Sequence, residues 1–312
     1  MNNPFTEKYR PTHLKDILGN SEVIESLENM LKYGSIPHML FYGPPGTGKT
    51  TAIRAMARQL YPTHYHSNVL EMNASDDRGI DTVRDSIKSF ASTVALKNKK
   101  KIIILDEADA MSRDAQNALR RIIEDFSSNT RFCIIANYSN KLIPAILSRC
   151  TKFRFAPVES DQIAKRITNI CLAENIEITP DGIDALIHMS SGDMRKLMND
   201  IEGIACSFKL INKTNVYTFC GLADEKEFKD LFDCMLNDRK DIIQSKIKML
   251  MDIYSLDLDT IITQLSELVI KSDMKNKMKI IKELAAIEYN LSIGCGNSIQ
   301  MNGVVAAFLG NK

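Results

Sequence analysis

Residues 43–50 form a glycine-rich segment, GPPGTGKT, which fits the pattern G-x-x-x-x-G-K-[ST] at every fixed position. Residues 38–42 before it are of strand character, and residues 51–60 after it carry apolar side chains at helical spacing. The pattern requires this order of strand, loop and helix, because glycines let backbone N–H groups surround phosphate oxygens at a helix N-terminus. The segment therefore predicts an α/β fold with a phosphate site.

Two side chains of this segment are assigned to a nucleotide. The ammonium group of Lys49 is expected to reach the β- and γ-phosphates, and the hydroxyl group of Thr50 to hold Mg²⁺. A glycine-rich turn without a ligand is the alternative, which the flanking strand and helix disfavour. The predicted nucleotide contacts of the segment are Gly43, Pro44, Pro45, Gly46, Thr47, Gly48, Lys49, Thr50 and Thr51.

Strands and helices alternate along the first half of the chain, which predicts a parallel sheet with helices on both faces. After Pro157 we expect helices alone, three of them up to residue 208 and more beyond residue 224. The expected strands are 69–72, 101–105, 131–136 and 151–155, and the helices between them are 80–94 and 115–126. The expected domains are a core at 1–156, a small helical domain at 157–223 and a helical C-terminal domain at 224–312.

Composition limits the classes of partner. The chain of 312 residues has 40 Lys and Arg against 39 Asp and Glu, which gives a formal net charge of +1. No global field attracts nucleic acid, so any such contact must use a local patch. The seven cysteines show no C-x-x-C pair, which favours reduced thiols over a disulfide frame. No apolar run reaches about 18 residues, so we expect no membrane span.

Residues 102–105 are an apolar strand that ends in acids. A carboxylate at a strand tip beside a phosphate loop can bind Mg²⁺, usually through water, which is the role expected of Asp106. Glu107 can orient and polarise an attacking water molecule. Asn137 follows the apolar strand 132–136 and could hold the same water or touch the γ-phosphate. Together these residues predict hydrolysis of a γ-phosphate; solvated acids at a strand end are the alternative.

Two arginines are candidates for a further cation at the transferred phosphate. Arg149 follows a probable helix just before the last strand, and Arg195 begins the third helix after Pro157. Phosphoryl transfer benefits from such a cation, which another subunit sometimes supplies. On spacing alone, each arginine fits a solvated surface side chain equally well.

These stretches together resemble an AAA+ ATPase, and more narrowly a small subunit of replication factor C, the eukaryotic sliding-clamp loader. The triplet Ser-Arg-Cys at 148–150 and the run at 73–80 are specific, whereas the phosphate loop alone is not. The helical C-terminal third suits the collar of this family but has no motif of its own. The resemblance is carried by residues 7–11, 43–50, 73–80, 106–109, 116–121, 148–150 and 192–195.

The resemblance implies the fold and the reaction. The fold would be a P-loop AAA+ core with a parallel sheet, followed by a small helical lid and an all-α collar. ATP and Mg²⁺ would be the cofactors, and ATP hydrolysis the reaction. No departure from the core motifs of the family is visible, so the chain resembles a subunit with a working ATP site.

The resemblance also implies a role for each candidate residue. Thr50 and Asp106 would serve Mg²⁺, and Glu107 would be the catalytic base. The other catalytic roles fall to Lys49, to Asn137 as first sensor, and to Arg149 as a finger acting in trans on ATP held by the neighbouring subunit. The remaining nucleotide contacts would be Arg195 as second sensor and, on the adenine and ribose side, Tyr9, Arg10 and Pro11.

The partners follow from the same resemblance. The family forms a nuclear heteropentamer of replication factor C subunits, which loads the ring-shaped clamp, proliferating cell nuclear antigen, onto primer-template DNA for replication and repair. Ile80, Arg84 and Lys88 recur every four residues on one probable helix and so share a face. Such a face would contact the phosphate backbone, with Arg78 as a further candidate. A basic surface stripe without a ligand is the alternative.

Two other functions compete with this interpretation. The chain could be a structural subunit of a related checkpoint or cohesion clamp loader that binds ATP with little turnover, although Glu107 and Asn137 argue against it. Residues 106–109 also spell the Asp-Glu-Ala-Asp signature of a helicase class. Such helicases need a second strand-rich domain, whereas the chain after Phe155 has a helical pattern.

Overall fold

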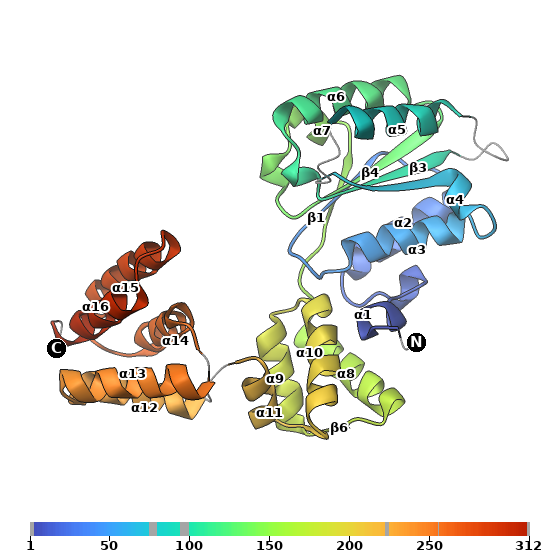
Figure 1. Ribbon diagram of the computed structural model, residues 1–312. Helices are drawn as coiled ribbons and strands as arrows, with labels where there is room; N and C mark the ends of the chain where they lie inside the picture. Colours follow the sequence, from blue (N-terminus) through green and yellow to red (C-terminus); the bar gives the residue numbers. More distant parts are fainter. Residues whose placement is uncertain (1–2, 75–79, 94–99, 222–224, 255, 311–312) are drawn as a thin grey trace. The chain divides into compact units, whose positions relative to one another are not determined.

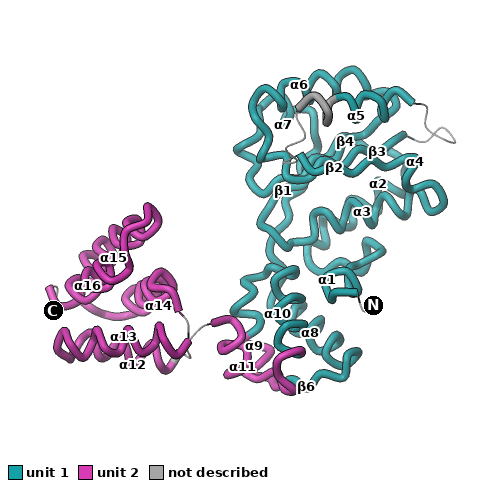
Figure 2. The backbone as a smooth tube through the Cα atoms, viewed as in Figure 1, with its two compact units in different colours: residues 1–178, 186–205 teal, residues 179–185, 206–312 magenta. Residues whose placement is uncertain are grey.

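The computed structural model describes residues 3–74, 80–93, 100–221, 225–254 and 256–310. The chain divides into two compact units (Figure 2). The first unit comprises residues 1–178 and 186–205, and the second comprises residues 179–185 and 206–312. The expected division into three domains cuts the chain at other positions and stays a prediction.

The first unit contains a five-stranded sheet with the order β2-β3-β4-β1-β5. All of its neighbouring strands are parallel, which confirms the predicted parallel sheet. Strand β1 positions the glycine-rich segment, which follows it directly. The strands are β1 (Met39–Tyr42), β2 (Val69–Asn73), β3 (Lys101–Asp106), β4 (Thr130–Ala136) and β5 (Thr151–Arg154).

Hydrophobic side chains fill both faces of the sheet, since alternate residues of a strand point to opposite faces. Phe41 and Ile104 pack with α2 and α3, whereas Leu40 and Ile103 pack with α5, α6 and α7. Figure 1 shows these two helical layers on opposite sides of the strands. The helices are α2 (Ser21–Tyr33), α3 (Lys49–Leu60), α5 (Ile80–Ser92), α6 (Arg113–Asp125) and α7 (Pro144–Leu147).

Because helices cover both faces, β1, β3 and β4 are largely apolar and give a strong signal in the sequence, whereas β5 is mostly polar. Shorter helices precede or lie between these elements along the chain. The first of them belongs to the N-terminal segment that contributes to the candidate site described below. Among the residues that the structure describes, these shorter helices are α1 (Phe5–Lys8), α4 (Tyr65–Asn68) and the 3₁₀ helices Leu14–Asp16, Ala108–Ala110 and Ser139–Lys141.

Helices dominate the chain after Phe155, as predicted: α8 (Ser160–Glu174), α9 (Pro180–Ser190) and α10 (Met194–Ser207). The expectation of helices alone is wrong at two places, where the two-residue strands β6 (Glu177–Ile178) and β7 (Leu210–Ile211) occur. A strand of two residues is too short to show the alternation by which strands are predicted. The described residues after Phe155 therefore contain no second strand-rich domain of the kind a helicase needs.

The second unit has a hydrophobic core of its own, formed by residues such as Leu231, Ile247 and Leu284. The described helices after residue 224 have apolar faces at helical spacing, which explains why the sequence predicts them. The short helix Lys213–Phe219 was not predicted. No helix in the described part of the chain is long and apolar enough to cross a membrane. The helices are α11 (Lys213–Phe219), α12 (Glu225–Asn237), α13 (Lys240–Tyr254), α14 (Leu258–Lys271), α15 (Lys277–Ser292) and α16 (Asn297–Leu309).

Gly43 lies directly after β1, and we expect its substitution to destabilise the fold more than that of any other glycine in the loop. Its φ is +146°, and a β-carbon there would overlap the carbonyl oxygen of Phe155. We expect Gly43→Ala to lower the free energy of unfolding by roughly 3 kcal/mol, because backbone strain and overpacking add. Urea unfolding monitored by circular dichroism measures this.

Gly34 supplies the matched control. Its φ is +69°, but nothing lies within 4 Å of the place where its β-carbon would be. Gly34→Ala should therefore cost only the left-handed strain, about 1 kcal/mol. Equal losses in the two variants would contradict a steric role for Phe155.

Candidate functional site

Three neighbouring strands place the candidate residues at one edge of the sheet. Strands β3, β4 and β1 are adjacent and parallel, with Tyr42 paired to Ala136. Their carboxyl ends therefore meet at the same edge, where ligands of open α/β sheets bind. Asp106 ends β3, Asn137 follows β4 and the glycine-rich loop follows β1.

A cleft in the first unit lies at this edge and brings most of the predicted residues together. The N-terminal segment, the loop, the strand tips and helix α10 all contribute to it. Among the predicted residues, those that line the cleft are Tyr9, Arg10, Pro11, Pro45, Gly46, Thr47, Gly48, Lys49, Thr50, Thr51, Asp106, Glu107, Asn137 and Arg195. Gly43, Pro44 and Arg149 are not part of its lining.

The side chain of Lys49 is held at this edge of the sheet by three hydrogen bonds. Lys49 is 7% exposed, and its Nζ donates to the carbonyl oxygens of Gly43 (2.7 Å) and Pro44 (2.6 Å) and to Oδ1 of Asn137 (3.0 Å). Burial lowers the pKa of Lys49, although the nearby Asp106 carboxylate acts in the opposite direction. The loop thus presents a buried cation whose partners here are neutral acceptors. Gly43 and Pro44 contribute to the site through their carbonyl oxygens, which accept from Lys49, although neither residue lines the cleft.

Thr50 and Asp106 form the second contact between loop and strand tip. The Thr50 hydroxyl donates to Oδ2 of Asp106 at 2.7 Å, and Oδ1 of Asp106 accepts from the N–H of Glu107 at 2.9 Å. A hydroxyl and a carboxylate are oxygen donors of the kind Mg²⁺ binds. The donor set therefore fits a hydrated Mg²⁺ ion.

Glu107 has an unusual backbone conformation. Its φ is 55° and its ψ is 36°, in the left-handed region that residues with a β-carbon rarely occupy. Strain of this kind gathers at functional sites. The conformation turns the chain sharply after β3 and leaves the Glu107 side chain exposed in the cleft lining.

The start of helix α10 lies against the loop. The N–H of Met194 donates to the carbonyl oxygen of Gly46 at 3.2 Å, and a β-carbon at Gly46 would overlap Asp193. Oδ1 of Asp193 accepts from the N–H of Arg195 at 2.8 Å and so caps the helix. Arg195 therefore lines the cleft from a helix end that is fixed on the loop.

An N-terminal segment (residues 5–11) contributes Thr6, Tyr9, Arg10 and Pro11 to the lining of the cleft. The Tyr9 hydroxyl donates to the Glu174 carboxylate, which also pairs with Nζ of Lys8 at 2.6 Å. Burial and the hydrogen bond to Glu174 raise the pKa of Tyr9 to about 12. Arg166 donates to the carbonyl oxygen of Tyr9 at 2.8 Å.

A third contact secures the beginning of this segment, because the N–H of Phe5 donates to Oε2 of Glu202 at 3.0 Å. Glu174 and Arg166 belong to α8, and Glu202 belongs to α10. The N-terminal segment is therefore attached to these two helices at both of its ends. The part of the cleft lining that this segment forms, the N-terminal wall, therefore depends on α8 and α10.

Several lining residues were missed by the sequence-based predictions. Apart from the polar Thr6, they are apolar or charged side chains without a motif, and chain-distant contacts bring them to the cleft. Met194 is the exception, because it lies next to Arg195 within residues 192–195, one of the stretches that carry the family resemblance. That stretch could have indicated Met194 as a lining residue. The missed residues are Thr6, Asp16, Ile17, Leu18, Val158, Arg166, Met194 and Met198.

The predicted DNA face falls partly outside the described chain. Arg78 lies outside the described residues, as do the side chains of Ile80 and Arg84. Lys88 lies on α5 and is partly exposed. DNA contact by this face stays a prediction.

Comparison with family models matches both parts of the chain. Residues 39–158 match the ATPase family associated with various cellular activities (AAA), and residues 223–307 match the replication factor C C-terminal domain. The first match contains the loop and all three strand tips of the cleft. The AAA match implies nucleotide binding there.

Curated relatives match over nearly the full chain. Replication factor C subunit 5 of Mus musculus is 43% identical over 98% of this chain and 92% of its own length. Replication factor C subunit 3 of Saccharomyces cerevisiae is 42% identical over 98% of this chain and 93% of its own. Within the family, residues 134–138 and 145–153 predict a chain most like the yeast-type subunit 3, which these relatives confirm.

A solved structure supports the fold independently. The chain of the RuvB Holliday junction branch migration motor of Thermotoga maritima superposes with a TM-score of 0.55. The match covers 81% of this chain and 87% of that chain, at 17% sequence identity. At this identity the likeness concerns the fold alone.

Glu174 should influence nucleotide affinity from outside the cleft. In Glu174→Ala, Tyr9 and Lys8 lose their shared acceptor, so the N-terminal wall loses one of its attachments to α8 while the hydrogen bond from Arg166 remains. We expect the dissociation constant for ATP to rise about three- to tenfold, as for the loss of a partly exposed charged hydrogen bond. Titration with a fluorescent ATP analogue measures it.

The exposed Glu177 provides a matched control, three residues further along the chain. Glu177→Ala should leave the affinity unchanged, and Glu174→Gln should be intermediate because its oxygen still accepts from Tyr9. Unchanged affinity in Glu174→Ala would show that the N-terminal wall holds its position without Glu174.

Proposed function

The chain belongs to the family of replication factor C subunits, the ATPase subunits of clamp loaders, and we propose that it hydrolyses ATP at a site that a neighbouring subunit completes. The observation that carries the proposal is the division of charged groups. Lys49, Asp106 and Glu107 converge in the cleft, whereas Arg149 is absent from its lining. One chain therefore offers most of a hydrolytic site together with a cation for another.

Binding of the phosphates rests on the loop. The loop N–H groups and the start of α3 favour anions, and Lys49 can exchange its carbonyl acceptors for β- and γ-phosphate oxygens. Charged acceptors bind an ammonium group more strongly than carbonyls do, which favours this exchange. Thr50 and Asp106 would hold Mg²⁺, which would neutralise negative charge on the phosphates when bound.

Hydrolysis needs a base and an oriented water. Glu107 at the tip of β3 is the base, since its carboxylate is exposed to the cleft beside Asp106. The Asn137 amide, held by Lys49, orients the water or senses the γ-phosphate. Arg195 contacts the nucleotide from the start of α10, where its hydrogen bond to Asp193 fixes the backbone.

The Arg149 side chain is partly exposed and acts on ATP of the adjoining subunit. A cation supplied in this way stabilises charge on the transferred phosphoryl group. In the proposed heteropentamer, ATP binding closes the subunits around the sliding clamp and primer-template DNA. Hydrolysis then releases both, in the nucleus, during replication and repair.

The first test uses reconstituted complexes whose other subunits carry hydrolysis-deficient sites. We expect Glu107→Gln in this chain to lower the remaining turnover by about 10²- to 10⁴-fold, the usual contribution of a general base. ATP binding should persist, because Lys49 and Thr50 are unchanged. Phosphate release and nucleotide titration measure the two effects. Equal turnover would instead favour a structural subunit that binds ATP without hydrolysing it.

A second test concerns the DNA face on α5. Lys88→Ala in the complex should weaken DNA binding and lower the slope of log affinity against log salt by about 0.9, for one lost phosphate contact. Fluorescence anisotropy at several salt concentrations measures the slope. Lys32→Ala, on α2 of the opposite helical layer, should leave it unchanged. An unchanged slope in Lys88→Ala would remove Lys88 from the DNA face.

A further inference from the structure

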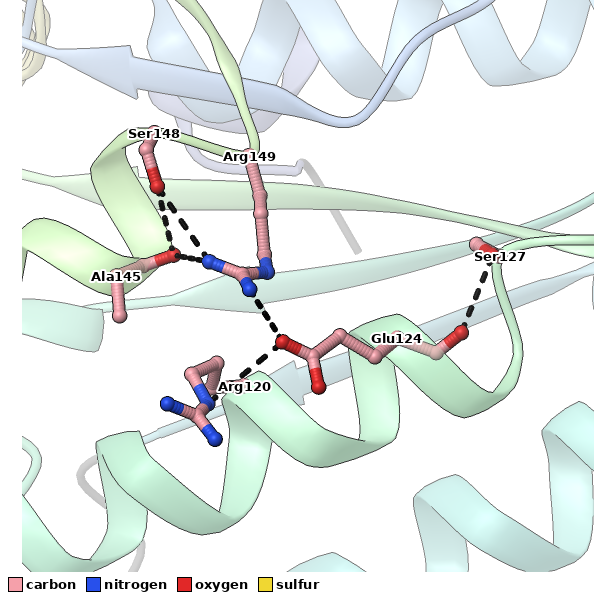
Figure 3. Close-up of polar contacts among 6 residues, drawn as sticks. All are labelled: Arg120, Glu124, Ser127, Ala145, Ser148 and Arg149. Atoms are coloured by element: carbon pink, nitrogen blue, oxygen red, sulfur yellow. Dashed lines mark hydrogen bonds and ion pairs between the residues drawn. The ribbon is translucent and has the colours of Figure 1, made fainter.

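Arg149 is held in a defined orientation by its own chain. Its Nη2 donates to Oε1 of Glu124, near the end of α6, and its Nη1 donates to the carbonyl oxygen of Ala145 at 2.7 Å (Figure 3). The Ser148 hydroxyl also bonds the Ala145 carbonyl oxygen, at 3.2 Å. Both terminal nitrogens of the guanidinium group therefore have a fixed acceptor.

The backbone beneath the side chain is fixed as well. Ile146 is fully buried and Cys150 is 9% exposed, so buried side chains anchor the chain on both sides of Arg149. The N–H of Arg149 donates to the carbonyl oxygen of Ile146 at 3.1 Å. Only the outer part of the side chain is left to be oriented, and Glu124 orients it.

The contacts leave N–H groups of the guanidinium group for an anion. The Nε–H has no hydrogen bond to the residues that the structure describes, and Nη2 has a second N–H besides the one that Glu124 accepts. Arginine donates such N–H groups to phosphate oxygens. An anion can therefore bind while Glu124 keeps its contact.

The net charge of the cluster formed by Arg120, Glu124 and Arg149 also favours binding of an anion. Nε of Arg120 lies 3.7 Å from the same Oε1 of Glu124, which is an ion-pair distance but too long for a hydrogen bond. Two guanidinium groups thus share one carboxylate, and the cluster keeps one net positive charge. Glu124 orients Arg149 without cancelling its attraction for a phosphate group.

We propose that Glu124 is a positioning residue for Arg149, which presets the guanidinium group for the γ-phosphate of ATP held by the adjoining subunit. This inference rests on the proposed trans role of Arg149. The Arg149 and Glu124 side chains are 36% and 40% exposed, so solvent weakens their pairing. The effect should therefore be moderate, about three- to fivefold in rate, in keeping with an exposed ion pair.

The experiment compares ATP hydrolysis by reconstituted complexes that carry variants of this chain. The signal is the part of the rate that Arg149→Ala removes. Glu124→Ala should lower kcat for this part about three- to fivefold and leave KM for ATP unchanged, because orientation matters most in the transition state. Glu124→Gln should recover part of the loss, since its amide oxygen still accepts from Nη2.

Asp125→Asn, at the neighbouring acid of α6, is the matched control and should leave the rate unchanged. Glu124→Ala added to Arg149→Ala should cause no further loss, as expected when one residue acts through the other. Thermal unfolding of each complex excludes a general loss of structure.

The outcomes separate the two proposals. If Arg149→Ala lowers the rate but Glu124→Ala leaves it unchanged or raises it, the positioning role is wrong and the trans role stands. A further loss in the double variant also overturns the positioning role. If Arg149→Ala changes nothing, the trans role and the positioning role fall together.

Discussion

The buried ammonium group of Lys49 depends on acceptors from two strands, and the site is built around that requirement. The carbonyl oxygens of Gly43 and Pro44 follow β1, and the Asn137 amide follows β4. A lysine 7% exposed would be unfavourable without these contacts, since burial alone lowers its pKa. Parallel pairing of β1 with β4 brings the acceptors to one edge of the sheet, so strand register is a condition of the phosphate site.

Two parts of the cleft lining are held in different ways. The positions of the strand tips and the loop follow from the sheet. The N-terminal segment is attached to α8 and α10 through Glu174, Arg166 and Glu202. Helix α10 also contacts the loop through Met194 and Gly46. A nucleotide that spans the cleft would therefore contact elements whose positions are coupled through these hydrogen bonds.

The sequence predicted which loop and strand-tip residues meet at the cleft, because the patterns that identify them are local. The loop pattern, the apolar strands and the acids after β3 lie within short stretches, and the parallel sheet follows from their alternation. Arg166 and Glu174 were missed because their contacts with Tyr9 join residues more than 150 positions apart. Strands β6 and β7 were missed because two residues show no period.

Under the proposed trans role of Arg149, one chain is an incomplete unit of function. Its anchors, Glu124 and Ala145, lie on α6 and α7, and neither residue lines the cleft of its own chain. Buried neighbours hold the backbone, and Ala145 and Glu124 hold the guanidinium group, so redirecting this group would break both of these contacts. A cation held in this way would serve a phosphate group that another molecule brings to it. Hydrolysis would then depend on the contact between subunits, and the geometry of assembly would control when ATP is consumed.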